Sequence, residues 1–118
     1  MLSALRPPSL APPVDNVFRA LSDPTRRQVL ERLSRSSGSV SELAEPFDMA
    51  LPSFLQHLRV LEESGLVRSE KRGRVRTYEL VAESLKPAED WLSRQRSMWE
   101  RRLDQLDGYL LQLKEKDE

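Results

Sequence analysis

Two groups of polar residues in this chain have types and spacing suited to chemistry at a surface. The first lies in LPSFLQHLRVLEESGLV (residues 51–67), where Ser53, Gln56 and Arg59 follow one another at intervals of three. On a helix these positions share one side, and their side chains can hydrogen-bond to base edges or phosphates. Most polar helix faces are merely hydrated, so this group needs support from elsewhere in the chain.

The second group is a run of basic residues just after that stretch. Between residues 68 and 76 there is one acid, Glu70, and the basic residues are Arg68, Lys71, Arg72, Arg74 and Arg76. The whole chain balances 19 basic against 19 acidic residues, so this positive charge is local. Clustered lysines and arginines bind phosphates, and arginine can enter a narrow minor groove. The alternative, an edge hairpin kept soluble by charge, explains scattered charges better than a cluster of one sign.

Helical periodicity precedes both groups. Residues 14–21 have apolar side chains at i, i+3, i+4 and i+7, which predicts an amphipathic helix. Asp23 and Pro24 then predict the start of a second helix, which ends before a loop at residues 35–38. We expect the arginines of this helix, Arg26 included, to face outward. Its inward side is expected to consist of Val29, Leu30 and Leu33.

A short third helix and the stretch 51–67 form the next unit. Ser41 is expected to cap the third helix, SELAEPF, and the turn FDMAL leads into a fourth helix that ends at Gly65. The inward face of the fourth helix is expected to hold Phe54, Leu58 and Leu61. Two helices joined in this way predict a helix-turn-helix, whose second helix lies in the major groove of DNA.

The rest of the chain predicts a hairpin and one long helix. Residues 66–71 and 75–80 read as strands around Gly73, and a helix follows from Pro87 to about Lys116. Its leucines alternate steps of four and three, as in a coiled coil. We expect a dimer interface between two copies of the chain that comprises Trp91, Leu92, Met98, Trp99, Leu103, Leu106, Leu110 and Leu113. The alternative is an organic-ligand pocket lined by Trp91, Met98 and Trp99.

Composition excludes several classes of protein. The chain has no cysteine, which excludes a disulfide framework, a thiolate nucleophile and a zinc finger. No apolar run could span a membrane, and MLSALRPPSLAPPV lacks the apolar stretch of a signal peptide, so we expect a cytoplasmic protein. No acid–base pair, phosphate loop or activated nucleophile is evident, so no enzyme activity and no cofactor are expected. His57 is expected to be structural, because one histidine makes no metal site.

Three segments carry a resemblance to a known family. FRALSDPTRRQVLERL (residues 18–33), SVSELAEPFDMALPSFLQHLRVLEESGLV (39–67) and RGRVRTYEL (72–80) resemble the ArsR family of bacterial winged-helix repressors, over about residues 14–82. The resemblance implies a homodimer that binds double-stranded operator DNA with a recognition helix and a wing. It also implies that an effector commonly releases the DNA. A dimer with two-fold symmetry predicts a palindromic operator.

The resemblance assigns a set of positions in this chain to DNA binding, and only some of them hold the residue types that are usual in the family. They are Leu51, Ser53, Leu55, Gln56, Arg59, Lys71, Arg72, Arg74 and Arg76. Leu51 and Leu55 stand where the family usually has polar residues facing DNA. They could meet thymine methyl groups or be drawn into the core, and both alternatives stay open here.

Known metal-sensing sites of the family have no match in this chain. The positions of one cysteine site hold Ser39, Ser41 and Ala44, and the last helix has acids such as Asp104 but no histidine. We therefore expect no metal site, and the sequence identifies no small-molecule effector. A winged-helix module that binds proteins and has lost DNA binding remains the second hypothesis.

These observations predict a mainly α protein with a small β-hairpin, a winged helix-turn-helix that dimerises through its terminal helices. The expected organisation is an extended proline-rich arm at residues 1–13, a DNA-binding domain at 14–82 and a dimerisation helix at 83–118.

Overall fold

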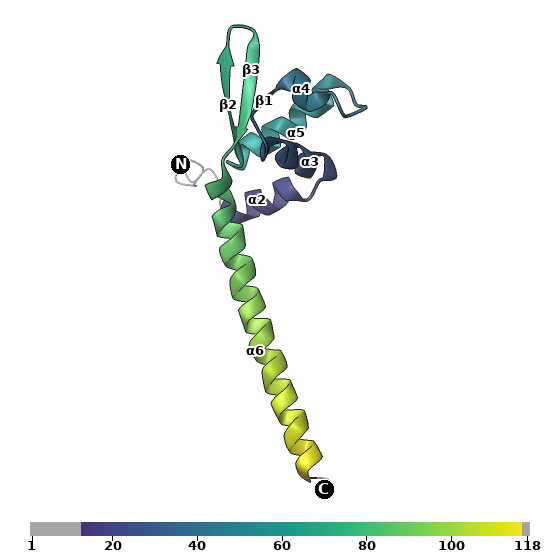
Figure 1. The fold of residues 1–118 in the computed structure, drawn as a ribbon, viewed down its shortest axis with the longest axis vertical. Helices are drawn as coiled ribbons and strands as arrows, with labels where there is room; N and C mark the ends of the chain where they lie inside the picture. Colours follow the sequence, from purple (N-terminus) through teal and green to yellow (C-terminus); the bar gives the residue numbers. More distant parts are fainter. Residues whose placement is uncertain (1–12, 117–118) are drawn as a thin grey trace, which may run out of the picture. The chain divides into compact units, whose positions relative to one another are not determined.

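The computed structural model describes residues 13–116, and these are mainly helical with a small antiparallel sheet, as predicted (Figure 1). The elements, in chain order, are α2 (Pro13–Leu21), α3 (Pro24–Leu33), β1 (Gly38–Ser39), α4 (Val40–Ala44), α5 (Leu51–Glu63), β2 (Val67–Arg72), β3 (Val75–Leu80), the 3-10 helix η1 (Ala82–Leu85) and α6 (Lys86–Lys116). The proline-rich arm predicted for residues 1–13 lies outside the described residues, except for residue 13. The chain divides into two compact units, one ending at Pro87 and the other beginning at Ala88.

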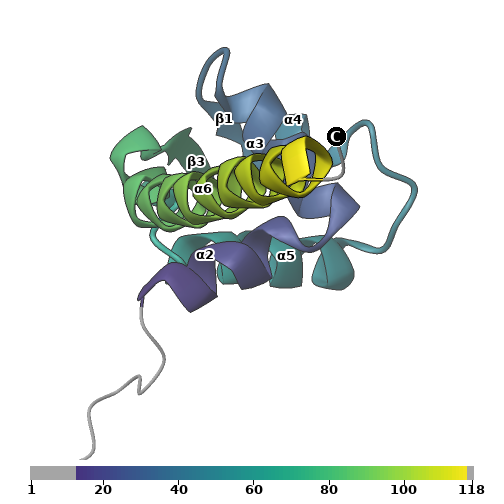
Figure 2. The ribbon, with the colours of Figure 1, turned by 90° about the horizontal axis from the view of Figure 1, so that it is seen from below.

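The core of the first unit is apolar and is shared by nearly all of its elements. Figure 2 shows α2 beside α5, and these two helices are in contact. The fully buried side chains of this core are those of Val17, Ala20, Val29, Leu43, Phe54, Leu58, Leu61, Leu66 and Val67. The rings of Phe47 and Phe54 pack with their centroids 5.5 Å apart, which fastens the turn between α4 and α5. Leu30, predicted to face inward, is only half-buried.

Two helix starts test the predicted caps. The carboxylate of Asp23 accepts a hydrogen bond from the backbone N–H of Arg26 at 3.0 Å, so the cap predicted for α3 is confirmed. The cap predicted for α4 is wrong, because Ser39 rather than Ser41 precedes its first turn. Ser39 Oγ accepts from the N–H of Glu42, whose carboxylate in turn accepts from the N–H of Ser39. This reciprocal capping box satisfies two backbone donors, whereas a cap at Ser41 would leave them without a partner.

A third strand appears where a loop was predicted. Gly38 and Ser39 pair with Tyr78 and Thr77, so the sheet order is β1-β3-β2 and β3 is central. A Cβ atom on Gly38 would lie 3.1 Å from the Leu43 side chain, so glycine allows this close approach. Strand β1 pairs with the middle of β3, while the tip of β2 and β3 projects beyond helices α2 to α5 (Figure 1).

The hairpin has the predicted position, with β2 beginning and ending one residue later than predicted. Arg72 pairs with Val75, which leaves Gly73 and Arg74 as a two-residue loop. Gly73 has a φ of 63°. Among the described residues, every residue with a positive φ is a glycine, so Arg74 has a negative φ. A positive φ at the first loop position is the pattern of a type II′ turn, whose twist matches that of the strands.

The second unit consists of the rest of α6, whose predicted extent agrees with the structure within one residue. The helix has 31 residues, or about 46 Å at 1.5 Å per residue. Its leucine seam is exposed throughout. Within the described residues, no helix is both long and apolar enough to cross a membrane.

The same substitution at two glycines should change stability in opposite directions. Gly73→Ala should destabilise the protein by about 1 kcal/mol, because alanine is strained at positive φ although space is open. Gly108→Ala should stabilise it by about 1 kcal/mol, because Gly108 lies inside α6 with open space around it. Urea unfolding monitored by circular dichroism measures both. Equal effects of the two changes would contradict the assigned backbone conformations.

Candidate nucleic-acid interface

The rotation of α5 about its own axis is fixed by three buried side chains. Phe54, Leu58 and Leu61 are at most 1% exposed, as predicted for the inward face. Because an α-helix turns about 100° per residue, Gln56 and Arg59 lie on the opposite side. Both are exposed, and Arg59 Nη1 donates to Gln56 Oε1 at 3.4 Å. The two side chains thus form one polar patch that faces away from the core.

The structure decides between the alternatives left open for the leucines of α5. Leu51 is 53% exposed and Leu55 is 38% exposed, so neither is drawn into the core. They lie one turn apart on the flank of α5 that faces the hairpin. Ser53 is also exposed, but it lies on the other flank. The exposed face of α5 is therefore apolar on the hairpin side and polar in the middle.

A groove of about 570 Å³ separates α5 from the hairpin. The residues that line it are Val40, Leu55, Arg59, Glu62, Glu63, Arg76 and Tyr78. The hydroxyl of Ser69 donates to the carboxylate of Glu62 at 2.5 Å and accepts from Arg76 Nη1 at 2.8 Å. These bonds connect α5, β2 and β3, so the floor of the groove is also what holds the hairpin against α5.

Tyr78 lies beneath this connection. Burial of the phenol, reinforced by the charge of Glu62, raises the pKa of Tyr78 above its ordinary value of 10.0. The side chain is therefore neutral at physiological pH and serves as a hydrogen-bonding group under the hairpin.

The strand register sorts the basic residues of the hairpin into two faces. Lys71 pairs with Arg76, and this pair shares the α5 side with Ser69 and Tyr78. Arg68 and Arg72 alternate onto the opposite face, while Arg74 lies in the loop at the tip. The residues predicted as one cluster are thus divided between two faces and a tip.

The two faces differ in how much of their charge is neutralised. On the outer face Arg68 forms an ion pair with Glu79, and Arg72 Nε lies 3.4 Å from Glu70 Oε1. Glu79 was missed in the charge count because it lies outside the basic run in sequence and is brought to Arg68 by strand pairing. Among the described residues, Lys71, Arg74 and Arg76 have no ion-pair partner, but Arg76 is hydrogen-bonded to Ser69, which in turn contacts the carboxylate of Glu62. Lys71 and Arg74 therefore present the least neutralised charge of the hairpin.

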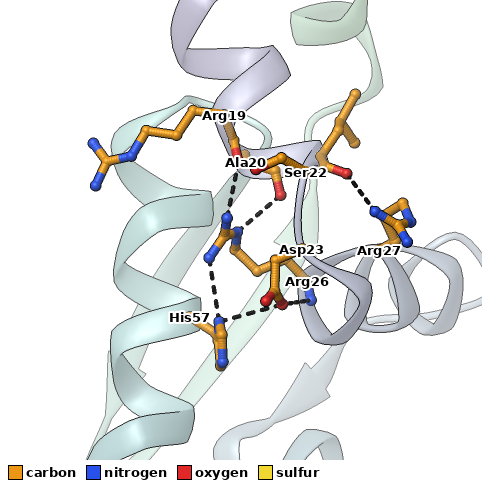
Figure 3. Close-up of polar contacts among 8 residues, drawn as sticks. Arg19, Ala20, Ser22, Asp23, Arg26, Arg27 and His57 are labelled. Carbon is orange, nitrogen blue, oxygen red and sulfur yellow. Dashed lines mark hydrogen bonds and ion pairs between the residues drawn. The ribbon is translucent and has the colours of Figure 1, made fainter.

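A polar network attaches α5 to the helices behind it (Figure 3). Arg26, predicted to face outward, instead turns toward the end of α2, where its Nε donates to the carbonyl of Ala20 and its Nη2 to that of Arg19, both at 2.8 Å. These carbonyls belong to the last turn of α2, and the carbonyl of Arg19 also accepts from the N–H and the hydroxyl of Ser22. The planar guanidinium can bind both and still reach α5, which explains why this arginine is half-buried.

On α5, the residue that takes part in this network is His57. Its Nδ1 lies 3.3 Å from Arg26 Nη1 and 3.5 Å from Asp23 Oδ2. This agrees with the predicted structural role, and both partners are side chains. Among the described residues, no group of three potential ligands could hold a metal ion.

The charge of Asp23 is stabilised within this network. Partial burial tends to raise the pKa of Asp23, but the hydrogen bond from the Arg26 N–H and the charges of His57 and Arg26 lower it below the ordinary value of 3.8. The carboxylate thus serves both as the cap of α3 and as a charged partner of His57 and Arg26.

Substitutions at Asp23 should separate these two roles. Asp23→Ala should cost about 1 kcal/mol of stability at pH 7, because the α3 cap is lost. Asp23→Asn retains a capping oxygen and should cost less. Because the pKa of Asp23 is lowered on folding, the advantage of wild type over the Asn variant is present at neutral pH and should shrink as pH falls below 3.8. Urea unfolding across this pH range tests it, and a constant difference would contradict a contribution from the charge.

Comparison with known proteins agrees with this architecture. Residues 21–70 match the model of a helix-turn-helix domain family. The transcriptional repressor SdpR of Bacillus subtilis is 32% identical over 79 residues, covering 67% of this chain and 88% of SdpR. The regulator KmtR of Mycobacterium tuberculosis is 42% identical over 73 residues, covering 62% of this chain and 56% of KmtR.

Solved structures of other proteins are also similar to this chain in sequence and in fold. The crystal structure of an ArsR family transcriptional regulator is 53% identical, with a TM-score of 0.72, and covers 75% of this chain and 98% of that one. An ArsR-like regulator from Rhodococcus sp. RHA1 is 35% identical, with a TM-score of 0.68, covering 80% of this chain and 89% of that one. The shared helix-turn-helix, the hairpin wing and these relatives show that the chain belongs to the ArsR family of winged helix-turn-helix transcriptional regulators.

Proposed function

We propose that this regulator represses transcription as a homodimer on a palindromic operator, with α5 in the major groove and the hairpin as a wing on the phosphate backbone. The observation that carries the proposal is the exposed face of α5, which offers Gln56 and Arg59 beside a basic hairpin. Glutamine can bond to adenine with both amide groups, and arginine can bond to guanine or a phosphate. These side chains supply sequence recognition.

The first turn of α5 and the hairpin supply contacts that do not depend on sequence. The N-cap of α5 is Ala50, whose side chain cannot bond to the free backbone N–H groups, so these can meet a phosphate oxygen. Lys71 and Arg74 lack ion-pair partners among the described residues and suit phosphates on either side of a groove. In a chain of zero net charge, DNA affinity depends on this local charge.

The leucines of α5 add an apolar kind of base recognition to the proposal. Leu51 and Leu55 are exposed next to the polar patch, where methyl groups of thymine in the major groove would give them an apolar partner. We therefore expect the operator half-site to contain A·T pairs opposite these leucines.

Dimerisation is proposed through α6. A monomer would leave its apolar seam in water, since Leu92, Trp99, Leu103, Leu106 and Leu110 are each at least 51% exposed in the single chain. Two copies would present two α5 helices to half-sites about 34 Å apart.

The proposed repressor works without a thiolate or imidazole metal sensor. The chain has no cysteine, and its one histidine is His57, which contacts Arg26 and Asp23. Any effector would therefore act through other chemistry.

Binding to DNA upstream of its own gene tests the proposed function. Fluorescence anisotropy should show at least 100-fold preference over scrambled DNA and a steep loss of affinity with salt. Neutralising Lys71, Arg72 and Arg74 to Gln should weaken binding to both DNAs and make the slope of log K against log salt shallower by roughly 0.9 per lost phosphate contact.

A control variant separates wing contacts from net charge. Neutralising Arg94, Arg101 and Lys116 on α6 removes the same number of charges and should leave the salt slope unchanged. Equal affinity for both DNAs at every salt concentration would reject specific repression. An unchanged slope in the hairpin variant would instead favour a protein-binding module.

Deoxyuridine tests the leucine contacts, because it lacks only the methyl group of thymidine. Replacing each thymidine of a bound half-site in turn should weaken wild-type binding about fourfold per contacted methyl, on the basis of about 0.8 kcal/mol per buried carbon. Leu55→Ser should remove the sensitivity at one position and leave the others. Full insensitivity of wild type would contradict methyl recognition without affecting the repressor proposal.

A further inference from the structure

One ring nitrogen of His57 lies beside two charged groups that require it in different protonation states. Its Nδ1 is 3.3 Å from Arg26 Nη1 and 3.5 Å from Asp23 Oδ2. A guanidinium stays protonated and only donates hydrogen bonds, whereas a carboxylate only accepts them. Nδ1 can therefore accept from Arg26 when it has no proton, or donate to Asp23 when it has one. It cannot do both at once.

Both partners of His57 are held in place by other bonds. Arg26 donates through Nε and Nη2 to the carbonyls of Ala20 and Arg19, and its remaining nitrogen, Nη1, meets the imidazole (Figure 3). Asp23 Oδ2 accepts from the N–H of Arg26 at the start of α3. Neither partner can move without losing these bonds, so a change in the protonation of His57 displaces the imidazole and the helix that carries it.

The neutral imidazole is the form that fits this geometry. With Nδ1 accepting from Arg26, the single ring proton is on Nε2. A proton on Nδ1 would oppose two N–H donors and place two positive charges side by side. It would also turn the approach to Asp23 into an ion pair, whose charge-assisted hydrogen bond is about 2.8 Å long. Protonation thus draws His57 away from Arg26 and toward Asp23.

Asp23 and Arg26 are the charged groups in contact with His57 among the described residues. Both come from the start of α3. From α2, the other helix that packs on this side of α5, the side chain of Arg19 extends away from the imidazole (Figure 3). The residues one turn away on α5 do not ionise, and they are Ser53, Phe54, Val60 and Leu61. The response of His57 to a proton therefore depends on these two partners.

A displaced imidazole changes what α5 presents on its exposed face. His57 directly follows Gln56 in the chain, and its bond to Arg26 ties α5 to the carbonyls at the end of α2. Hydrogen bonds to base edges weaken steeply with poor distance or angle. When the bond to Arg26 is lost, Gln56 and Arg59 are aimed less well at the bases.

We propose that His57 is a positioning residue that makes DNA binding sensitive to protons: the neutral form, bonded to Arg26, holds α5 for DNA, and protonation transfers His57 to Asp23 and weakens binding. The inference rests on the proposed DNA-binding function. The proton then acts as an effector that requires no metal and no organic ligand. The sign of the effect is informative, because an added positive charge by itself strengthens binding to phosphates.

DNA affinity as a function of pH tests the proposal, because the chain has one histidine and histidine is the side chain that ordinarily changes charge between about pH 5 and 8. Fluorescence anisotropy with DNA upstream of its own gene, at constant ionic strength, should show binding at least about fivefold weaker at roughly pH 5.5 than at roughly pH 7.5. Circular dichroism should show the same helix content at both pH values.

Two variants separate the proton from the packing of the side chain. His57→Asn keeps an acceptor facing Arg26 but cannot be protonated, so its affinity should be nearly independent of pH. Asp23→Asn keeps the α3 cap but removes the charge that attracts the imidazolium, so its affinity should fall only at a more acidic pH. Asp104→Asn, an exposed position on α6, removes the same charge and should keep the wild-type profile.

Proton displacement gives a readout that a purely structural role would not move. Because linkage is reciprocal, DNA that prefers neutral His57 should release its proton. In mildly acidic solution, the Hε1 resonance of this one imidazole should therefore move toward its neutral position when DNA is added.

Four results would overturn the proposal. They are equal or tighter wild-type binding in acid, a wild-type pH profile in His57→Asn, a resonance that moves toward its protonated position, and a loss of helix that accompanies the loss of affinity. The first three leave the repressor proposal intact. A wild-type protein that binds the DNA at neither pH would instead reject the proposed function itself.

Discussion

The burial of Phe54, Leu58 and Leu61 is the constraint on which the rest of the structure depends. Together these three side chains fix how α5 is rotated, and thereby which of its residues face away from the core. Exposing any one of them would cost several kcal/mol in lost burial and cavity formation, so rotation of the helix is effectively forbidden. Gln56, Arg59 and the leucine flank are presented outward as a consequence of core packing, with no bond needed to hold them there.

Polar contacts add to the apolar core in fixing the position of α5 relative to α2 and to the hairpin. Arg26 joins the end of α2 to His57, and the Glu62–Ser69–Arg76 connection joins the other flank of α5 to the hairpin. The recognition helix is thus held from behind by one network and toward the wing by another. Such bonds contribute little net stability individually, but they set the distance between α5 and the hairpin. In the proposed complex, a wing at a fixed distance from α5 would follow the backbone of the groove that α5 enters.

Much of this arrangement was predictable from local sequence rules, and the exceptions have physical causes. Apolar spacing identified the inward face of α5, and Asp23-Pro24 identified the start of α3. Strand β1 was missed because two residues carry no periodicity and gain their strand character only from pairing with β3. The role of Arg26 was missed because its acceptors are backbone carbonyls of another helix. The charge balance of the hairpin was misjudged for a similar reason, since Glu79 meets Arg68 only through the register.

Selection of bound sequences from a random DNA pool by the wild-type protein tests the central claim most directly. If the exposed face of α5 recognises bases in a two-fold symmetric dimer, the recovered sequences should share a palindrome whose half-sites are centred about 10 base pairs, or a multiple of that, apart. Each half-site should include A·T pairs for Gln56 and the leucines. Recovery of sequences that share no motif, at affinities equal to the starting pool, would contradict the account.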